Sequence, residues 1–120
     1  MNKKILALAA LAGGLAVALG AFGAHGLQEV LLANGRADTY HTAVTYHMFH
    51  ALALLVLAVG EIPGQKITAG LLTGGILVFS GSLYLLSVTN LTWLGAITPL
   101  GGFMFMAGWG WLFFQSIKKN

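Results

Sequence analysis

The sequence is poor in charged residues. Asp, Glu, Lys and Arg make up 8% of its 120 residues, whereas an ordinary soluble domain carries about 25%. The 51 residues of the range 67–117 contain none of the four. A soluble domain of this size cannot bury so much uncharged, apolar sequence, but a pair of membrane crossings at about 20 residues each accounts for it. We therefore expect an integral membrane protein.

Other absences exclude whole classes of chemistry. The chain has no cysteine, which rules out disulfides, thiolate metal ligands and thiol catalysis. Its three acids are Glu29, Asp38 and Glu61, and none lies within an apolar run. No embedded carboxylate is therefore present to orient a Ser–His pair or to complete a metal site. The net charge of +3 comes from residues at segment ends rather than from a basic patch, so we expect no nucleic-acid partner.

The apolar residues group into four segments that predict an all-α, integral membrane four-helix bundle. Lipid offers the backbone no hydrogen-bond partners, so the spanning segments must be helices. Lys3 and Lys4 before an apolar run are also typical of a signal peptide, but the length of this run favours an uncleaved first span. The whole chain, 1–120, is then one transmembrane domain, with spans at about 5–24, 39–60, 67–88 and 93–114.

The distribution of positive charge predicts the orientation. With the N-terminus inside, the cytoplasmic side holds five of the six basic residues and the other side holds only Arg36; the five are Lys3, Lys4, Lys66, Lys118 and Lys119. This asymmetry follows the positive-inside rule. We expect both termini to be cytoplasmic in a multi-pass protein of the bacterial cytoplasmic (inner) membrane. Trp93 is expected at the outer interface, and Trp109 and Trp111 toward the inner one.

The longest loop, 25–38, is expected outside the membrane. Within it, residues 28–32 predict a short amphipathic turn that ends at Asn34 and Gly35. Asp38 or Thr39 is expected to cap the second span, because either side chain can accept from free amide groups.

The 17 glycines include several that recur at steps of three, four or seven residues along the predicted spans. Small residues at such steps let two helix backbones approach closely, within one chain or between chains. We therefore expect helix packing at seven of them, and a homo-oligomer is one possible use: Gly13, Gly20, Gly70, Gly74, Gly81, Gly101 and Gly108.

Polar side chains gather in one half of the bundle. On a helix, Tyr40, His47 and His50 share one face of the second span, and deep histidines should face protein rather than lipid. Polar groups of the other spans lie at a similar depth. Pro99 also frees the carbonyl of Gly95 as an acceptor. The candidate polar cluster or binding site comprises His25, Tyr40, Tyr46, His47, His50, Ser80, Ser82, Tyr84 and Thr98.

Three interpretations of this cluster remain open. It is a set of interhelical hydrogen bonds that fixes packing, a site for a small solute, lipid or proton, or a metal or haem site. His47 and His50 are spaced i, i+3, but the missing carboxylates and thiolates argue against a metal. We expect no catalytic residue, no metal and no cofactor.

Four motifs together resemble a known family. They are residues 20–26 (GAFGAHG), residues 39–50 (TYHTAVTYHMFH), residues 79–84 (FSGSLY), and residues 98–102 (TPLGG) followed by Gly108 and Trp109. In this order they resemble the domain-of-unknown-function family 423, similar to transmembrane protein 256. The resemblance implies a small four-span protein of a bacterial inner membrane or of mitochondria, and it implies no catalytic residue.

The favoured function is that of a non-enzymatic structural or accessory subunit. Its partners would be the lipid bilayer and either further copies of the chain or a larger membrane complex. The alternative is a small-solute, lipid or proton-handling protein that uses the polar cluster.

Overall fold

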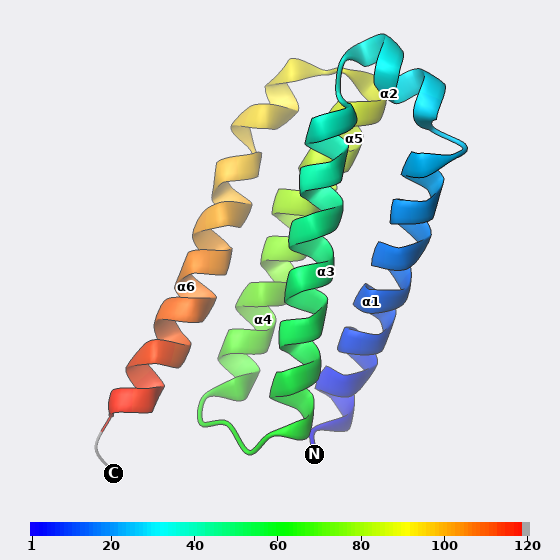
Figure 1. Ribbon diagram of the computed structural model, residues 1–120. Coiled ribbons are helices and arrows are strands. Elements are labelled where there is room, and N and C mark those ends of the chain that lie inside the picture. Colours follow the sequence, from blue (N-terminus) through cyan, green and yellow to red (C-terminus); the bar gives the residue numbers. More distant parts are fainter. Residues whose placement is uncertain (119–120) are drawn as a thin grey trace.

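The computed structural model describes residues 1–118, which form helices and turns and no strand (Figure 1). Lys119, which contributed to the predicted orientation, lies outside the described residues. The all-helical prediction is confirmed. In chain order the elements are α1 (Lys3–Ala24), α2 (Gln28–Asn34), α3 (Ala37–Val59), α4 (Gln65–Gly75), the π-helix η1 (Ile76–Ser80), α5 (Gly81–Thr89), the 3₁₀-helix η2 (Thr92–Ala96) and α6 (Thr98–Ile117).

Four helical segments of the described chain are long and apolar enough to cross a membrane: Lys3–Ala24, Ala37–Val59, Gln65–Thr89 and Thr92–Ile117. The third combines α4, η1 and α5, and the fourth combines η2 and α6. Pro99 lies in the first turn of α6, where its missing N–H removes no helical hydrogen bond. The Gly95 carbonyl was expected as a possible acceptor, but the buried tyrosine and histidine groups of the described chain bond elsewhere. Nearby, the Thr98 hydroxyl donates to the carbonyl of Leu94, at 3.4 Å.

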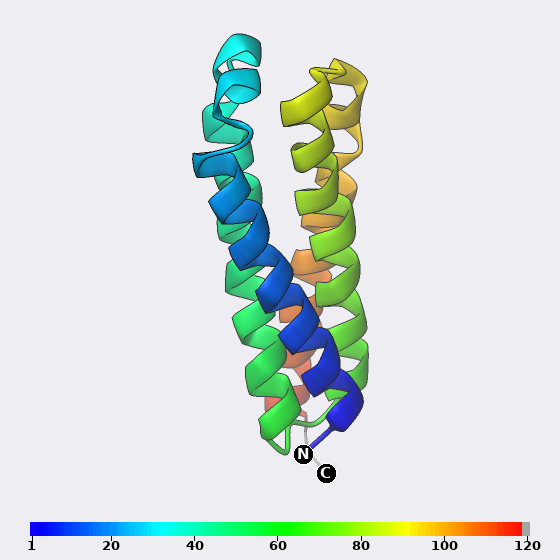
Figure 2. The same ribbon diagram turned by 90° about the vertical axis from the view of Figure 1, so that its right-hand side faces the viewer.

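The four spans form two layers. Figure 2 shows α1 with α3 in one layer, and the α4–η1–α5 span with α6 in the other. The molecule is long and thin, at 54 × 26 × 17 Å. Both termini and the α3–α4 loop lie at one end, called the terminal end; α2 and η2 lie at the other, called the α2 end (Figure 1).

Two side-chain amides donate hydrogen bonds to backbone carbonyls at the C-terminal ends of helices. At the α2 end, Asn34 Nδ2 donates to the carbonyls of Ser87 and Val88, both at 3.0 Å. At the terminal end, Gln65 Nε2 donates to the carbonyl of Leu57 at 2.6 Å and to that of Gly60 at 3.3 Å. The last carbonyls of a helix have no partner within it, so each amide satisfies acceptors that the bilayer would leave unpaired.

The turn at the α2 end differs in part from expectation. Helix α2 ends at Asn34, and Gly35 follows with a left-handed φ of 66°, which glycine adopts without steric cost. The expected cap on α3 is wrong: the cap residue is Arg36, with no side-chain capping bond, and neither Asp38 nor Thr39 has this role. Arg36 Nε instead donates to Asn90 Oδ1 at 3.0 Å.

The glycines of the predicted packing stripes fall into two groups. A Cβ built on Gly101 would lie 2.2 Å from the backbone nitrogen of Phe79, and Gly20, Gly74 and Gly108 also face side chains of other helices. Helix α6 can therefore approach η1 closely at Gly101. In contrast, a Cβ on Gly13, Gly70 or Gly81 would have no atom within 4 Å, so packing within one chain does not account for these three.

Two apolar clusters lie along the bundle. The larger contains Ile5, Leu54, Leu72 and Phe105 and lies toward the terminal end. The smaller is formed by Ala43, Leu83, Leu86 and Leu94 and lies toward the α2 end. On α3, His47 and His50 lie between Ala43 of the smaller cluster and Leu54 of the larger. The other polar groups extend from this level toward the α2 end, and we call His47, Ser80, Ser82, Tyr84 and Thr98 the polar band.

Candidate functional site

His47 lies between the two layers. It is buried, with 4% of its surface exposed, and its Nδ1 atom is 2.8 Å from the hydroxyl of Tyr84 on α5. The backbone of Ala12 on α1 also interacts with the imidazole. The ring of Tyr84 packs against that of Tyr40, with centroids 5.2 Å apart. His47 therefore links three of the four spans.

The hydroxyl groups near His47 have partners within the chain. Ser80 Oγ donates to the carbonyl of Ala43 at 2.8 Å, which joins η1 to α3. Ser82 Oγ and Thr98 Oγ1 are 2.6 Å apart, which joins α5 to α6. The Tyr40 hydroxyl donates to the carbonyl of Leu19 on α1. Each span thus contributes to at least one polar contact with another span.

His50 has a different set of partners. Its Nδ1 atom is 2.8 Å from the carbonyl of Tyr46, and the indole Nε1 of Trp109 donates to its Nε2 atom at 3.1 Å. A carbonyl only accepts and an indole N–H only donates. These partners therefore select the neutral tautomer of His50 that carries its proton on Nδ1, and they occupy both ring nitrogens.

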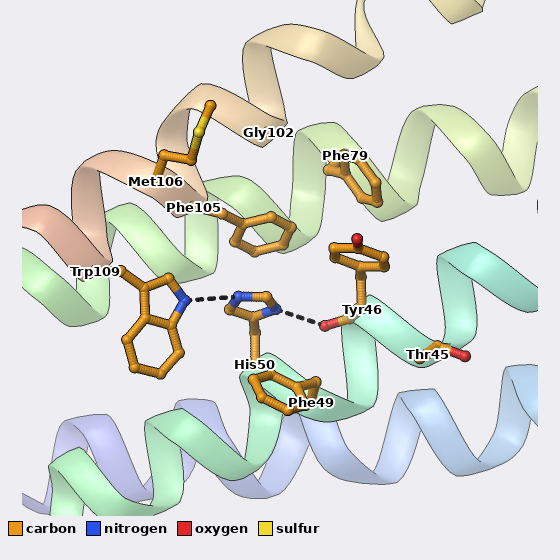
Figure 3. A pocket seen from close by; sticks show the side chains of 9 residues that line it. All are labelled: Thr45, Tyr46, Phe49, His50, Phe79, Gly102, Phe105, Met106 and Trp109. Carbon is orange, nitrogen blue, oxygen red and sulfur yellow. Dashed lines mark hydrogen bonds between the residues drawn. The ribbon is translucent and has the colours of Figure 1, made fainter.

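A cavity of about 590 Å³ lies beside His50. Residues of α3, η1 and α6 line it (Figure 3): Thr45, Tyr46, Phe49, His50, Phe79, Gly102, Phe105, Met106 and Trp109. The imidazole of His50 stacks on Phe105 with ring centroids 3.7 Å apart, and Tyr46 packs on Phe79 at 4.7 Å. Phe49 and Met106 are 61% and 60% exposed, so the cavity opens sideways at the surface that faces lipid in a membrane.

The structure does not bring all the candidate residues together. His25 ends α1 at the α2 end, where it is exposed and apart from the band. Tyr46 belongs to the cavity rather than to the His47 contacts. Tyr40, His47 and Tyr84 form one group, since His47 bonds to Tyr84 and the Tyr84 ring packs on Tyr40, whereas Ser80 bonds separately to the carbonyl of Ala43.

Sequence reasoning missed the role of Trp109. It was expected toward the inner membrane interface, and it does lie in the half of the Thr92–Ile117 span that is nearer the terminal end, but its N–H group is bound to His50. Phe79 and Phe105 were also overlooked. A signal was present, because a buried indole N–H usually finds an acceptor, although that of Trp111 on the same helix has none among the described residues. The only side-chain ring acceptors deep in the apolar segments of the sequence are His47 and His50.

The geometry favours hydrogen bonding over ligation or proton transfer. Among residues 1–118, no three His, Cys, Asp or Glu side chains come together as a candidate metal site. A metal at His50 would have to displace either Trp109 or the Tyr46 carbonyl. The contacts of Tyr40, Ser80 and His50 end on backbone carbonyls, so in the described chain they form separate links rather than one relay.

The comparisons with known proteins establish the family. The model of the family described as "Protein of unknown function (DUF423)" matches residues 19–102. This chain belongs to the DUF423 family. The match spans Tyr40, both deep histidines, Tyr84 and Gly101, so the band and most of the cavity lie within the family region, and the resemblance noted from the sequence is confirmed.

Relatives that span nearly the whole chain are membrane proteins by name. The UPF0382 membrane protein YwdK of Bacillus subtilis is 47% identical, over 97% of this chain and 98% of that protein. A UPF0382 membrane protein of Haemophilus influenzae is 40% identical, over 100% and 98%. The UPF0382 inner membrane protein YgdD of Escherichia coli is 38% identical, over 98% and 92%. No solved structure matches this DUF423 chain.

Proposed function

We propose that this chain is a non-enzymatic accessory protein of the bacterial cytoplasmic membrane, with both termini on the cytoplasmic side. The observation that carries this proposal is the pairing of the polar band. His47, Tyr84, Ser80, Ser82 and Thr98 bond to one another or to the backbone, which leaves them engaged in holding the spans together. Interhelical bonds of this kind contribute about 0.6 kcal/mol each, so they determine geometry more than stability.

The accessory role is supported by the surface of the first span. Leu11 and Val17 of α1 are each 62% exposed, and Gly13 and Gly14 have open space where a side chain would lie. Small residues on an apolar helix face allow another helix to approach closely. This face is available to a second copy or to another membrane protein.

Cross-linking from α1 tests this association. Because the chain has no cysteine, Gly14→Cys would be the only thiol, and we expect it to form a disulfide between copies or a cross-link to a partner in native membranes. Ala16→Cys is the matched control, since Ala16 is fully buried within the chain. Equal behaviour of the two variants, together with a lone monomer after gentle detergent extraction, would contradict the accessory role.

The orientation has its own test. A membrane-impermeant maleimide applied to intact cells or spheroplasts should label Glu29→Cys in α2. Lys66→Cys, in the first turn of α4, should react only after the membrane is opened. Labelling in the opposite order would overturn the proposed orientation.

A second candidate function is the binding of a molecule dissolved in the membrane. The observation that favours it is the lateral cavity between α3 and α6. Ligand pockets of proteins span about 300–1,000 Å³ and are mostly apolar with a few polar groups, and this cavity has both properties.

A further inference from the structure

We propose that the cavity beside His50 binds the ring of an uncharged, carbonyl-bearing lipid of the quinone class, and that the Tyr46 hydroxyl donates a hydrogen bond to a ring carbonyl. This inference rests on the second candidate function and names its ligand class. It follows from four properties of the cavity, namely its charge, its free donor, its depth and its aromatic walls.

The first property is the absence of charge from the lining. Within the described chain, none of the residues around the cavity is Asp, Glu, Lys or Arg, and the partners of His50 select its neutral form. An ionised ligand would have to lose its hydration without gaining a counter-charge, which is costly in an apolar site. The occupant is therefore uncharged.

The second property is a free hydrogen-bond donor. Figure 3 shows the backbone carbonyl of Tyr46 bonded to His50, whereas the Tyr46 hydroxyl has no bond to any other lining residue. His50 itself has no free nitrogen. The cavity thus offers one phenolic O–H, and leaving such a group unpaired away from water is unfavourable. A ligand with a carbonyl acceptor satisfies it.

The third property is depth. Tyr46 comes nine residues after the start of α3, which places it about 14 Å along a helix of about 33 Å. The hydrocarbon core of a bilayer is about 30 Å thick, so the Tyr46 backbone lies well inside it. Headgroups and ester carbonyls of phospholipids lie at the edges of this core, whereas an uncharged lipid with its carbonyl on an apolar ring dissolves within it.

The fourth property is the set of aromatic walls. Tyr46 and Phe79 form one pair and His50 and Phe105 another, and Trp109 closes one side (Figure 3). Aromatic groups attract one another in offset or edge-to-face contacts, so a flat ring suits these walls. Its isoprenoid or alkyl tail leaves past Phe49 and Met106, which are more exposed than Tyr46 and Trp109.

The test uses decylubiquinone as the probe and Trp109 as the reporter. In the Trp93→Phe/Trp111→Phe background, reconstituted in nanodiscs, quinone should quench the Trp109 fluorescence to saturation. Tyr46→Phe removes only the hydroxyl and should weaken binding about fivefold, the effect of a lost hydrogen bond of about 1 kcal/mol. n-Decylbenzene, which has no carbonyl, should displace the quinone with equal strength in both variants.

A matched pair of glycine substitutions locates the site. Gly102 lines the cavity, and a Cβ there meets only Phe79 Cδ2, at 3.9 Å, so Gly102→Leu should fill the space and abolish saturable quenching. Gly110 is on the same helix with nothing within 4 Å, and Gly110→Leu should leave binding unchanged. Circular dichroism and gel filtration establish that both variants are folded.

The outcomes separate the ligand class from the wider function. Binding that Gly102→Leu abolishes but Tyr46→Phe leaves unchanged would overturn the quinone proposal, while the cavity would still bind apolar molecules. Non-saturating quenching, or saturable binding that Gly102→Leu leaves intact, would overturn both. None of these results bears on the cross-links expected from α1, so the accessory role stands or falls separately.

Discussion

His47 and His50 lie three residues apart on one helix and are equally buried, at 4% exposure, but their surroundings differ. His47 binds a tyrosine hydroxyl on α5 and lies where α1, α3 and α5 meet. His50 binds an indole on α6 and borders an open cavity. Depth and burial therefore do not determine what an intramembrane histidine does. The role of such a histidine depends on which side chains of the neighbouring helices contact it.

The two histidine environments differ because α6 lies close to η1 at one level and farther from α3 at another. At Gly101, α6 contacts the backbone of η1, but one residue later Gly102 leaves space beside Phe79. The π-helix widens the backbone at this point, and such segments often occur at functional sites of helices. Helix α6 therefore packs closely on η1 while leaving a space beside α3 and His50.

The largest expected effect comes from Gly101→Ala, which should disrupt both histidine environments at once. The new methyl group would meet the Phe79 backbone, and an overpacked core of this kind costs about 1–3 kcal/mol or more. We expect a large loss of stability in an SDS titration followed by circular dichroism. Gly110→Ala, with open space around it, should be neutral or slightly stabilising; equal losses in the two variants would refute close packing at Gly101.

An intermediate effect is expected from the contact between His47 and Tyr84. In a double-mutant cycle of His47→Leu and Tyr84→Phe, we expect a coupling energy of about 0.6 kcal/mol, and at most about 1.7 kcal/mol, as for other hydrogen bonds between membrane helices. His41 is exposed on the same helix, so His41→Leu should be additive with Tyr84→Phe. If the stability effects were additive in both pairs, the contact between His47 and Tyr84 would contribute nothing to stability.

The smallest effect on stability is expected from Trp109→Phe. The ring is kept, but His50 Nε2 loses its donor, at a cost of about 0.6 kcal/mol. The sharper measurement is ¹⁵N NMR of His50, which should show a protonated Nδ1 and an unprotonated Nε2, with only the Nε2 signal moving strongly on substitution. Trp93→Phe, at the α2 end, is the control. An Nε2-protonated ring in the unaltered protein would contradict the assigned tautomer.

The sequence predicted the helical class, the four apolar segments and the burial of the α3 face, because lipid permits few alternatives and a period of 3.6 residues is easily recognised. It did not predict the break between η2 and α6, which depends on local hydrogen bonds near Pro99. It also could not pair Trp109 with His50, since the two are 59 residues apart and their contact depends on how α6 lies against α3. The cavity depends on the spacing between helices, which a local sequence pattern does not predict.

The absence of formal charge from the middle of every span has an electrical consequence. An elementary charge that crosses the whole membrane changes its energy by about 2.3 kcal/mol per 100 mV. Among the described residues, none of the buried side chains is Asp, Glu, Lys or Arg, and His50 is held neutral. Rearranging these helices moves almost no charge through the field, so an energised membrane and a depolarised one should hold this protein in the same conformation.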